Sequence, residues 1–191
     1  TNSIAVAVGM GAEVTVLDTN LNRLRELDAL YAGRLRTIAS NSFEIERAVK
    51  DADLVIGSVL IPGAKAPKLV TNELVKKMKP GAVLVDIAID QGGCFEDSKP
   101  TTHAEPTFKV HDTVFYCVAN MPGAVPHTST YALTNATLPY VKAIATLGWK
   151  HALQADPALA LGLNTFAGAV VNEPVAVAHQ MESKPLSSAL A

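Results

Sequence analysis

The order of apolar and polar residues predicts short strands that alternate with helices up to residue 120. Continuous Val, Ile and Leu runs are typical of strands buried on both faces of a parallel sheet, whereas apolar residues three or four apart are typical of helices. The apolar runs predict strands over 13–17, 34–40, 53–60, 82–89 and 114–120. The spacing predicts a first helix that ends near Gly9 or Gly11 and further helices over 21–30, 43–52 and 71–78. The alternation indicates an α/β fold with a doubly wound parallel sheet.

This pattern stops at Pro126, after an irregular stretch that precedes the last strand. Residues 128–147 predict one long helix, 163–171 a strand, and 173–182 a helix with Pro174 in its first turn. We therefore divide the chain into a nucleotide-binding-type α/β unit over 1–125 and a C-terminal segment over 126–191. Leu21, Leu24, Leu27 and Leu30 predict the apolar stripe of the helix over 21–30, and Thr71 is a plausible N-cap.

Composition excludes several classes of protein. Of the 191 residues, 49% are hydrophobic and 18% are charged, and the formal net charge is -2. This balance predicts a globular chain with no basic field for nucleic acid or a membrane surface, and no apolar run is long enough to span a bilayer. Cys94 and Cys117 predict free thiols in the cytoplasm rather than a disulfide framework. The histidines lack metal-ligand spacing, so we predict no metal site.

The first residues, TNSIAVAVGMGAEVTVLD, predict a helix that runs directly into a strand. They lack an initiator Met and the basic region of a signal peptide. We expect the chain to be a fragment of a longer protein, cut on its N-terminal side.

Candidate ligand contacts lie where strands end, because open α/β sheets bind ligands beyond the carboxyl ends of their strands. Five positions qualify: Asp18, Ser40, Val59-Leu60, Ile87–Asp90 and Val118–Met121. A carboxylate at Asp18 is suited to the ribose hydroxyls of a dinucleotide, NAD rather than NADP, or it caps the next helix. The glycine fingerprint of such a fold would lie immediately before Thr1. Ser40 either contacts a ligand or caps the helix that starts near 42, and Arg23 either lines the adenine side or is solvated.

Asp90 lies in VLVDIAIDQGG, residues 83–93, where an apolar strand ends in a carboxylate followed by Gly92 and Gly93. The glycines permit close approach of the backbone to a ligand, and the carboxylate could act as a general acid/base. The alternative is an aspartate that simply starts a turn. Lys65 and Lys68, in the loop over 61–69, lack a Walker motif and are interpreted as exposed loop lysines.

Two long stretches resemble bacterial alanine dehydrogenases. They are VLIPGAKAPKLVTNELVKKMKPGAVLVDIAIDQGGCFEDSKPTTHAEPTF and VANMPGAVPHTSTYALTNATLPYV. The NAD-binding subunit of proton-translocating transhydrogenase is a relative with the same layout and the alternative assignment, but DIAIDQGG favours the dehydrogenase. The resemblance implies a Rossmann-type domain and reversible oxidative deamination of L-alanine to pyruvate and ammonium, with NAD as cofactor.

The resemblance also implies roles for residues. Asp90 corresponds to a general acid/base next to the nicotinamide, and Asp18 to the ribose-binding carboxylate. The family's cofactor-lining positions correspond to Arg23, Ser40, Val59, Leu60, Ile87, Ala88, Ile89, Asp90, Val118, Ala119, Asn120 and Met121. Lys99 stands where the family can carry an arginine, a departure that leaves its role open.

The same resemblance implies that parts of the enzyme lie outside this sequence. These are the first strand, the glycine loop, and an N-terminal lobe that supplies a substrate-binding lysine and arginine and a catalytic histidine. We therefore expect a free sheet edge where that strand belongs, exposed apolar surface after Pro126, and negligible deamination by residues 1–191 alone. The family is commonly hexameric, which implies a homo-oligomer.

Overall fold

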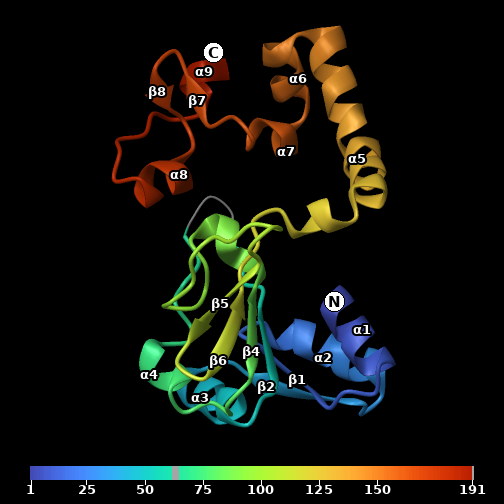
Figure 1. The fold of residues 1–191 in the computed structure, drawn as a ribbon. Helices are drawn as coiled ribbons and strands as arrows, with labels where there is room; N and C mark the ends of the chain where they lie inside the picture. The colour runs from blue at the N-terminus through green and yellow to red at the C-terminus, as the bar shows by residue number, and fades with distance from the viewer. Residues whose placement is uncertain (62–64, 191) are drawn as a thin grey trace.

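The computed structural model describes residues 1–61 and 65–190; residues 62–64 of the predicted loop lie outside it. Figure 1 shows an α/β part followed by a helical part. The first part contains α1 (Asn2–Gly9), β1 (Val14–Asp18), α2 (Leu21–Tyr31), β2 (Leu35–Ala39), α3 (Ser42–Lys50), β3 (Leu54–Gly57), α4 (Asn72–Val75), β4 (Val83–Asp86), the 3-10 helix η1 (Ile87–Gln91), β5 (Thr107–Val110), β6 (Thr113–Tyr116) and the 3-10 helix η2 (Met121–Ala124). The second contains α5 (Pro126–Leu147), α6 (Trp149–Ala155), α7 (Pro157–Ala160), β7 (Thr165–Phe166), β8 (Ala169–Val170), α8 (Glu173–Ala178) and α9 (Ser187–Leu190).

The strands form a split parallel sheet. β1 pairs with β2 in parallel, and a second sheet has the order β3-β4-β6-β5, in which only β5 is antiparallel. In the doubly wound order 3-2-1-4-5-6, β2 and β1 take positions 3 and 2, and β3, β4 and β6 take positions 4, 5 and 6. The predicted α/β class is confirmed. None of the described strands pairs with the free edges of β1 and β3, as expected for a Rossmann-type sheet without its first strand.

The two sheets of the α/β part have separate apolar cores. The larger core surrounds β4 and β6, where Leu84 and Phe115 are fully buried. The smaller core packs α2 onto β1 and β2 through Leu27, Tyr31 and Leu35. Because a helix repeats every 3.6 residues, its buried face drifts away from a strict three-residue spacing.

The predicted leucine stripe of α2 is therefore only half right. Leu24 and Leu27 are buried, but Leu21 and Leu30 are 52% and 66% exposed. Tyr31 takes the next core position instead of Leu30.

Side-chain caps set the helix starts. Asn20 accepts the N–H of Arg23 at the start of α2, and Asn41 accepts the N–H of Glu44 at the start of α3. Thr71 accepts the N–H of Leu74 at 3.3 Å, so its predicted capping role is confirmed. The helix that follows, α4, covers only 72–75 rather than 71–78.

Three strands end three or four residues earlier than the apolar runs predict, and all three corrections concern the carboxyl ends of the strands, where open α/β sheets bind ligands. β3 ends at Gly57 rather than at residue 60, and β6 ends at Tyr116 rather than at 120. β4 ends at Asp86 because the carboxylate of this residue accepts the N–H of Ala88 and turns the chain into η1. The irregular stretch before residue 114 contains β5, which forms an unpredicted antiparallel pair with β6.

The C-terminal part differs from the expected strand and helix. Residues 163–171 form the hairpin β7–β8, because Ala167 and Gly168 both have positive φ, at 47° and 78°. α8 ends at Ala178, before Gln180 at φ 55°, and α6, α7 and α9 were not predicted. The division at residue 125 stays a prediction, although α5 begins at Pro126.

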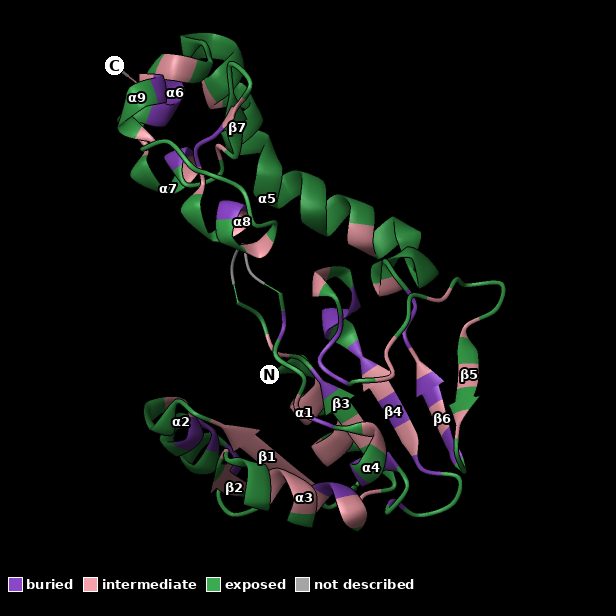
Figure 2. Ribbon diagram, turned by 90° about the vertical axis from the view of Figure 1, so that its left-hand side faces the viewer, coloured by how far each residue is buried: buried purple, intermediate pink, exposed green. Residues whose placement is uncertain are grey.

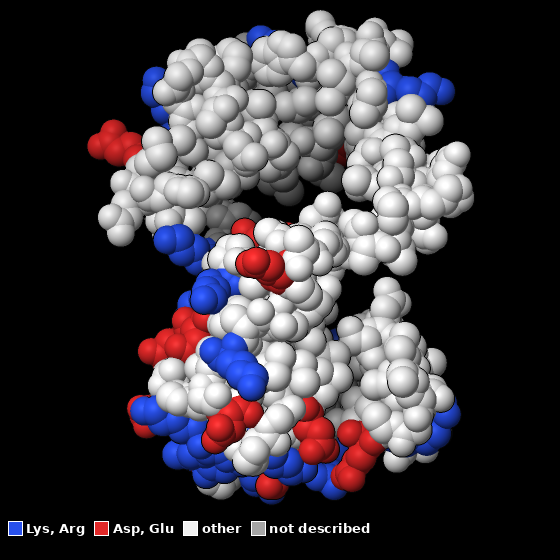
Figure 3. Space-filling view, in the orientation of Figure 1, with Lys and Arg blue, Asp and Glu red and all other residues white. Residues whose placement is uncertain are grey.

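α5 has no buried residue along its 22 residues, and Figure 2 shows it in the colours of exposed and intermediate residues. Its exposed apolar side chains include Tyr131, Leu133 and Val141. Only six of the chain's 34 charged residues follow Val125, and in Figure 3 the charged atoms gather on the α/β part. The expected exposed apolar surface after Pro126 is therefore present. Within the described residues, no helix has the length and apolarity needed to cross a membrane.

Candidate functional site

Asp18 is the last residue of β1, at the edge where the parallel strands end. It is half-buried, and its Oδ1 accepts the N–H of Asn20 at 2.8 Å. Among the described residues its Oδ2 has no hydrogen-bond partner. Asn20, not Asp18, caps α2, so the alternative capping role of Asp18 is wrong. One carboxylate oxygen at this strand end is free to accept hydrogen bonds from a ligand.

Arg23 and Ser40 both follow Asp18 in the sequence, Arg23 on α2 and Ser40 after β2. The N–H of Ser40 donates to the carbonyl oxygen of Asp18 at 2.9 Å, which brings the ends of β1 and β2 together. Asn41 caps α3, so the capping alternative for Ser40 is also wrong. The guanidinium of Arg23 is not simply solvated, because it donates to Glu26 at 2.7 Å and to Thr1 at 2.5 Å.

The apolar candidates divide into exposed and buried side chains. Leu60 and Ile87 are 71% and 45% exposed, and Ala119, Asn120 and Met121 are exposed or half-buried, as is Val59. In contrast, Ala88, Ile89 and Val118 have buried side chains. These three belong to the core or its edge, so a ligand could reach them only through their backbone.

Asp90 lies on η1, immediately beyond the end of β4. The buried side chains of Ala88 and Ile89 anchor η1, while the Asp90 carboxylate is exposed and has no hydrogen bond or ion pair with the described residues. The structure therefore contradicts a purely strand-terminating role, since that role falls to Asp86. Asp90 is a free carboxylate on an anchored turn.

Asp86 is fully buried and holds the turn together. Its carboxylate accepts the N–H of Cys94 at 2.9 Å and that of Phe95 at 3.4 Å, in addition to the N–H of Ala88 at 3.0 Å. The hydroxyl of Ser98 donates to the same carboxylate. A buried charge is tolerated when hydrogen bonds surround it, and here they tie the start of η1 to the loop after Asp90. The sequence signalled Asp86 only as a break in an apolar run.

Two glycines permit this packing. A Cβ on Gly57, at the end of β3, would lie 2.2 Å from Cys94 Sγ. A Cβ on Gly93 would lie 2.7 Å from Asp86 Oδ2, and Gly93 also has φ +75°. The glycine pair after Asp90 therefore serves the turn as well as any approach to a ligand.

Both cysteines are free and buried beside this carboxylate. Burial and the neighbouring Asp86 charge raise the pKa of the Cys94 thiol to about 12. Burial also raises the pKa of the Cys117 thiol. Both thiols are therefore protonated at neutral pH and are poor nucleophiles.

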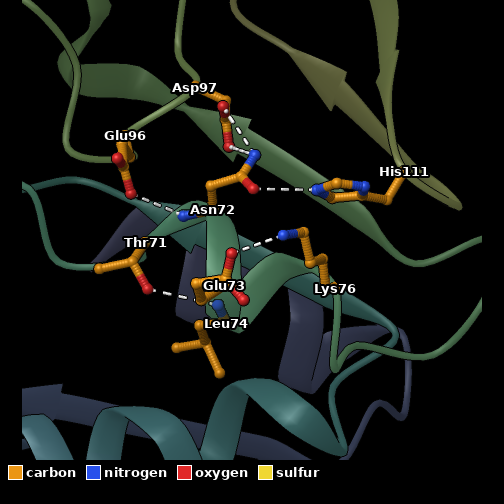
Figure 4. A network of polar contacts seen from close by, with 8 residues as sticks. All are labelled: Thr71, Asn72, Glu73, Leu74, Lys76, Glu96, Asp97 and His111. Carbon is orange, nitrogen blue, oxygen red and sulfur yellow. Dashed lines mark hydrogen bonds and ion pairs between the residues drawn. The ribbon is translucent and has the colours of Figure 1, made fainter.

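A second polar network fastens the chain after the turn to α4 (Figure 4). The N–H of Asn72 donates to Glu96 at 2.7 Å, and its side-chain amide donates to both carboxylate oxygens of Asp97. His111 Nε2 lies 3.1 Å from the side-chain oxygen of Asn72. Residues 86–97 are thus held at both ends, which fixes the position of η1.

Asn120 has a left-handed backbone, with φ +57°, directly before η2. Its carbonyl oxygen lies 3.1 Å from His103 Nε2. Non-glycine residues at positive φ are uncommon and concentrate at functional sites. Lys99 lies with its Nζ 4.5 Å from the ring centroid of Phe108, so its charge rests on an aromatic face.

The described residues contain no group of three or more His, Cys, Asp or Glu side chains that could hold a metal ion.

Comparison with known proteins decides the family. The profile described as "Alanine dehydrogenase/PNT, C-terminal domain" matches residues 1–173. The chain belongs to the alanine dehydrogenase/PNT family. The resemblance noted in the sequence is confirmed by this match.

Relatives in this family are similar along nearly the whole chain. Alanine dehydrogenase from Mycolicibacterium smegmatis is 67% identical over 175 residues, which are 92% of this chain and 47% of that protein. The alanine dehydrogenase of Staphylococcus haemolyticus is 57% identical over 191 residues, 100% of this chain and 51% of that protein. This alanine dehydrogenase/PNT chain thus spans about half the length of the curated relatives that it matches.

Two solved structures support the same family. An L-alanine dehydrogenase matches with a TM-score of 0.80 and 50% identity over 93% of this chain and 49% of that chain. A transhydrogenase from Sinorhizobium meliloti matches with a TM-score of 0.69 and 25% identity over 90% of this chain and 46% of that chain. The dehydrogenase is the nearer of the two in sequence and in fold.

Proposed function

We propose that this chain is the NAD(H)-binding portion of an alanine dehydrogenase. The reaction converts L-alanine, NAD⁺ and water to pyruvate, ammonium, NADH and a proton. The observation that carries the proposal is the free carboxylate of Asp90, held on the anchored η1 at the end of β4. It occurs in a chain 57% to 67% identical to alanine dehydrogenases. The transhydrogenase alternative has weaker support, at 25% identity.

The strand ends fit a dinucleotide. At the end of β1, Asp18 has an unpaired oxygen that can accept hydrogen bonds from ribose hydroxyls, and its charge disfavours a 2′-phosphate. The exposed Leu60 and Ile87 supply apolar surface for a flat ring near Asp90. Arg23, Ser40 and the backbone at Ala88, Ile89 and Val118–Met121 complete the proposed contacts. Bound NAD supplies the acceptor for the hydride that leaves the alanine Cα.

Asp90 has two proton transfers to perform. As a base it accepts a proton from the water that attacks the imine carbon of the oxidised substrate. As an acid it returns a proton to the nitrogen that departs as ammonia. One carboxylate on a fixed turn can do both, because the proton that it accepts in the first step is the proton that it donates in the second. The buried thiols, protonated and enclosed, take no part.

The whole-enzyme properties are part of the same proposal. The hexamer implied by the resemblance stays a prediction, and so does the cytoplasmic location, with which the two free thiols agree. The lysine, arginine and histidine that the family uses to bind and activate alanine have no counterpart among the residues assigned here.

The test replaces Asp90 by Asn in the complete gene product that carries these residues. Alanine-dependent NADH formation should fall by about 10²- to 10⁴-fold in kcat, the usual contribution of a general acid/base. Asp53→Asn is the matched control, because Asp53 is exposed and its carboxylate, among the described residues, pairs only with Lys79 at 3.0 Å. Unchanged turnover in Asp90→Asn would refute the catalytic role.

A further inference from the structure

The ammonium group of Lys68 lies on the loop that follows Asp90. Its Nζ donates to the carbonyl oxygens of Gly92 at 2.6 Å, Gly93 at 2.9 Å and Phe95 at 3.0 Å. A lysine ammonium has three N–H donors, so this one loop takes all of them. Lys68 is an exposed loop lysine, as predicted, but its ammonium is bound to the loop and is not simply solvated.

Asp86 binds the same loop through its backbone N–H groups. Its carboxylate accepts the N–H groups of Cys94 and Phe95, while Lys68 binds carbonyl oxygens. The backbone of Phe95 binds both side chains, since its N–H donates to Asp86 and its carbonyl oxygen accepts from Lys68. Hydrogen bonds to charged groups are the stronger kind, so one anion and one cation fix the course of the loop.

The backbone around Lys68 is paired to the loop as well. The N–H of Ala66 donates to Gln91 at 3.0 Å, and the N–H of Leu69 donates to Cys94 at 2.7 Å. Val70 and Phe95 form an isolated parallel bridge. Lys68 thus extends from a segment that already lies along the loop. Little further backbone entropy is lost when its ammonium binds there.

We propose that Lys68 is a positioning residue for Asp90. By binding the carbonyl groups of Gly92, Gly93 and Phe95 it fixes the loop over 92–95, and thereby the direction in which the Asp90 carboxylate points. The inference rests on the proposed function, because it assumes that Asp90 transfers protons. Lys68 is exposed. If its ammonium is removed, the backbone hydrogen bonds to the loop and the contacts of Asp86 are still present. Its removal should therefore disturb geometry more than folding.

The experiment uses Lys68→Met, Lys68→Arg and Lys65→Met in the complete gene product. Lys65 is the matched control, because it lies three residues earlier and has no hydrogen bond or ion pair with the described residues. Lys68→Met should lower kcat by about tenfold to a hundredfold, the range expected for a misplaced catalytic group, and change KM for NAD by less than about twofold. Lys68→Arg should recover part of kcat, and Lys65→Met should match the parent.

The same substitution is then made in the Asp90→Asn background. If Lys68 acts through Asp90, Lys68→Met should cause no further loss of kcat there, because the two effects are not additive. A full additional loss would overturn the inference and leave the role of Asp90 intact.

Hydrogen exchange supplies a readout that does not depend on turnover. The N–H groups of Gly92 and Gly93 donate to Ile89 and Ala88 at 3.0 Å, so their exchange should accelerate in Lys68→Met and not in Lys65→Met. Unchanged exchange, or faster exchange with unchanged kcat, overturns the inference. Unchanged turnover in Asp90→Asn refutes the proposed function itself, whatever the exchange of these amides shows.

Discussion

β1 and β4 both end in an aspartate, and the two aspartates begin with the same local contact. Asp18 Oδ1 accepts the N–H of Asn20 at 2.8 Å, and Asp86 Oδ1 accepts the N–H of Ala88 at 3.0 Å. Beyond that contact they differ. Asp86 is fully buried, and the loop after η1 adds donors from Cys94, Phe95 and Ser98. In contrast, the second oxygen of the half-buried Asp18 has no hydrogen-bond partner among the described residues.

The difference separates two uses of one motif. When both carboxylate oxygens of a strand-end aspartate accept hydrogen bonds within the protein, the residue has a structural role and is not available to a ligand. One with a free oxygen is available to a ligand. At β4 the chain contains both in succession, since the buried Asp86 supports the turn on which the free Asp90 lies.

The largest expected effect is on the stability of Asp86→Ala. This change leaves buried N–H groups and a hydroxyl without an acceptor, and each unsatisfied group costs about 1–3 kcal/mol. We expect a loss of about 4 kcal/mol in the free energy of unfolding, measured by urea denaturation with far-UV circular dichroism. Asp18→Ala, as the paired variant, should lose less than about 1 kcal/mol. Equal losses would contradict the distinction between the two strand ends.

Gly93→Ala should be the next most severe change. The new methyl group would lie 2.6 Å from Ser98 Cβ and 2.7 Å from Asp86 Oδ2, at φ +75°. Strain and displacement together should lower the free energy of unfolding by about 2–3 kcal/mol. Gly92→Ala measures the conformational strain alone, because Gly92 has a similar φ of +87° but nothing within 4 Å of the added Cβ. A loss as large in Gly92→Ala would show that the backbone conformation, not contact with Asp86, decides the cost.

The free oxygen of Asp18 predicts a binding effect in place of a stability effect. In the complete gene product, Asp18→Ala should raise the Kd for NADH about tenfold, as expected for one lost charged hydrogen bond. Isothermal titration calorimetry measures this change. Asp53→Ala should leave the Kd unchanged, because Asp53 is exposed and pairs with Lys79. An unaltered Kd in Asp18→Ala would remove this carboxylate from the ribose site.

The smallest effect concerns pH. Burial and the Asp86 charge raise the pKa of the Cys94 thiol in the folded chain to about 12, from an ordinary value of 9.0. The folded state therefore favours the neutral thiol, and its contribution to stability is complete below pH 9 and is lost as pH rises towards 12. By pH 10 the loss should reach about 1 kcal/mol. Urea denaturation at pH 8 and pH 10 should show a smaller pH-dependent loss in Cys94→Ala, and an equal loss would rule out this thiol.

The sequence predicts the fold class because it follows from local pattern. The alternation of strands and helices identified the α/β class, and Thr71 was found from its residue type alone. The strand ends were missed by up to four residues, since the apolar run continues through Ile87 and Ile89 although the backbone has already turned at Asp86. Those two residues are apolar for different reasons, because Ile89 is core while Ile87 is exposed.

The site could be predicted only in part. Asp18 and Asp90 were found from their positions at strand ends, but their surroundings depend on contacts across the fold. Lys68 illustrates the limit: it binds carbonyl groups 24 to 27 residues away, and no local pattern distinguishes it from Lys65. The caps Asn20 and Asn41 were also missed. The sequence suggested Asp18 and Ser40, which lie two residues and one residue earlier.

The free edges of β1 and β3 also bear on how this chain unfolds. Because no described strand pairs between them, we expect the smaller core under α2 and the larger core around β4 to unfold as two separate cooperative units. Amide exchange in mild denaturant would then divide the strands into two sets with different opening free energies. The smaller set, β1 and β2, would open first, so the strand end that carries Asp18 would become disordered while Asp90 keeps its place.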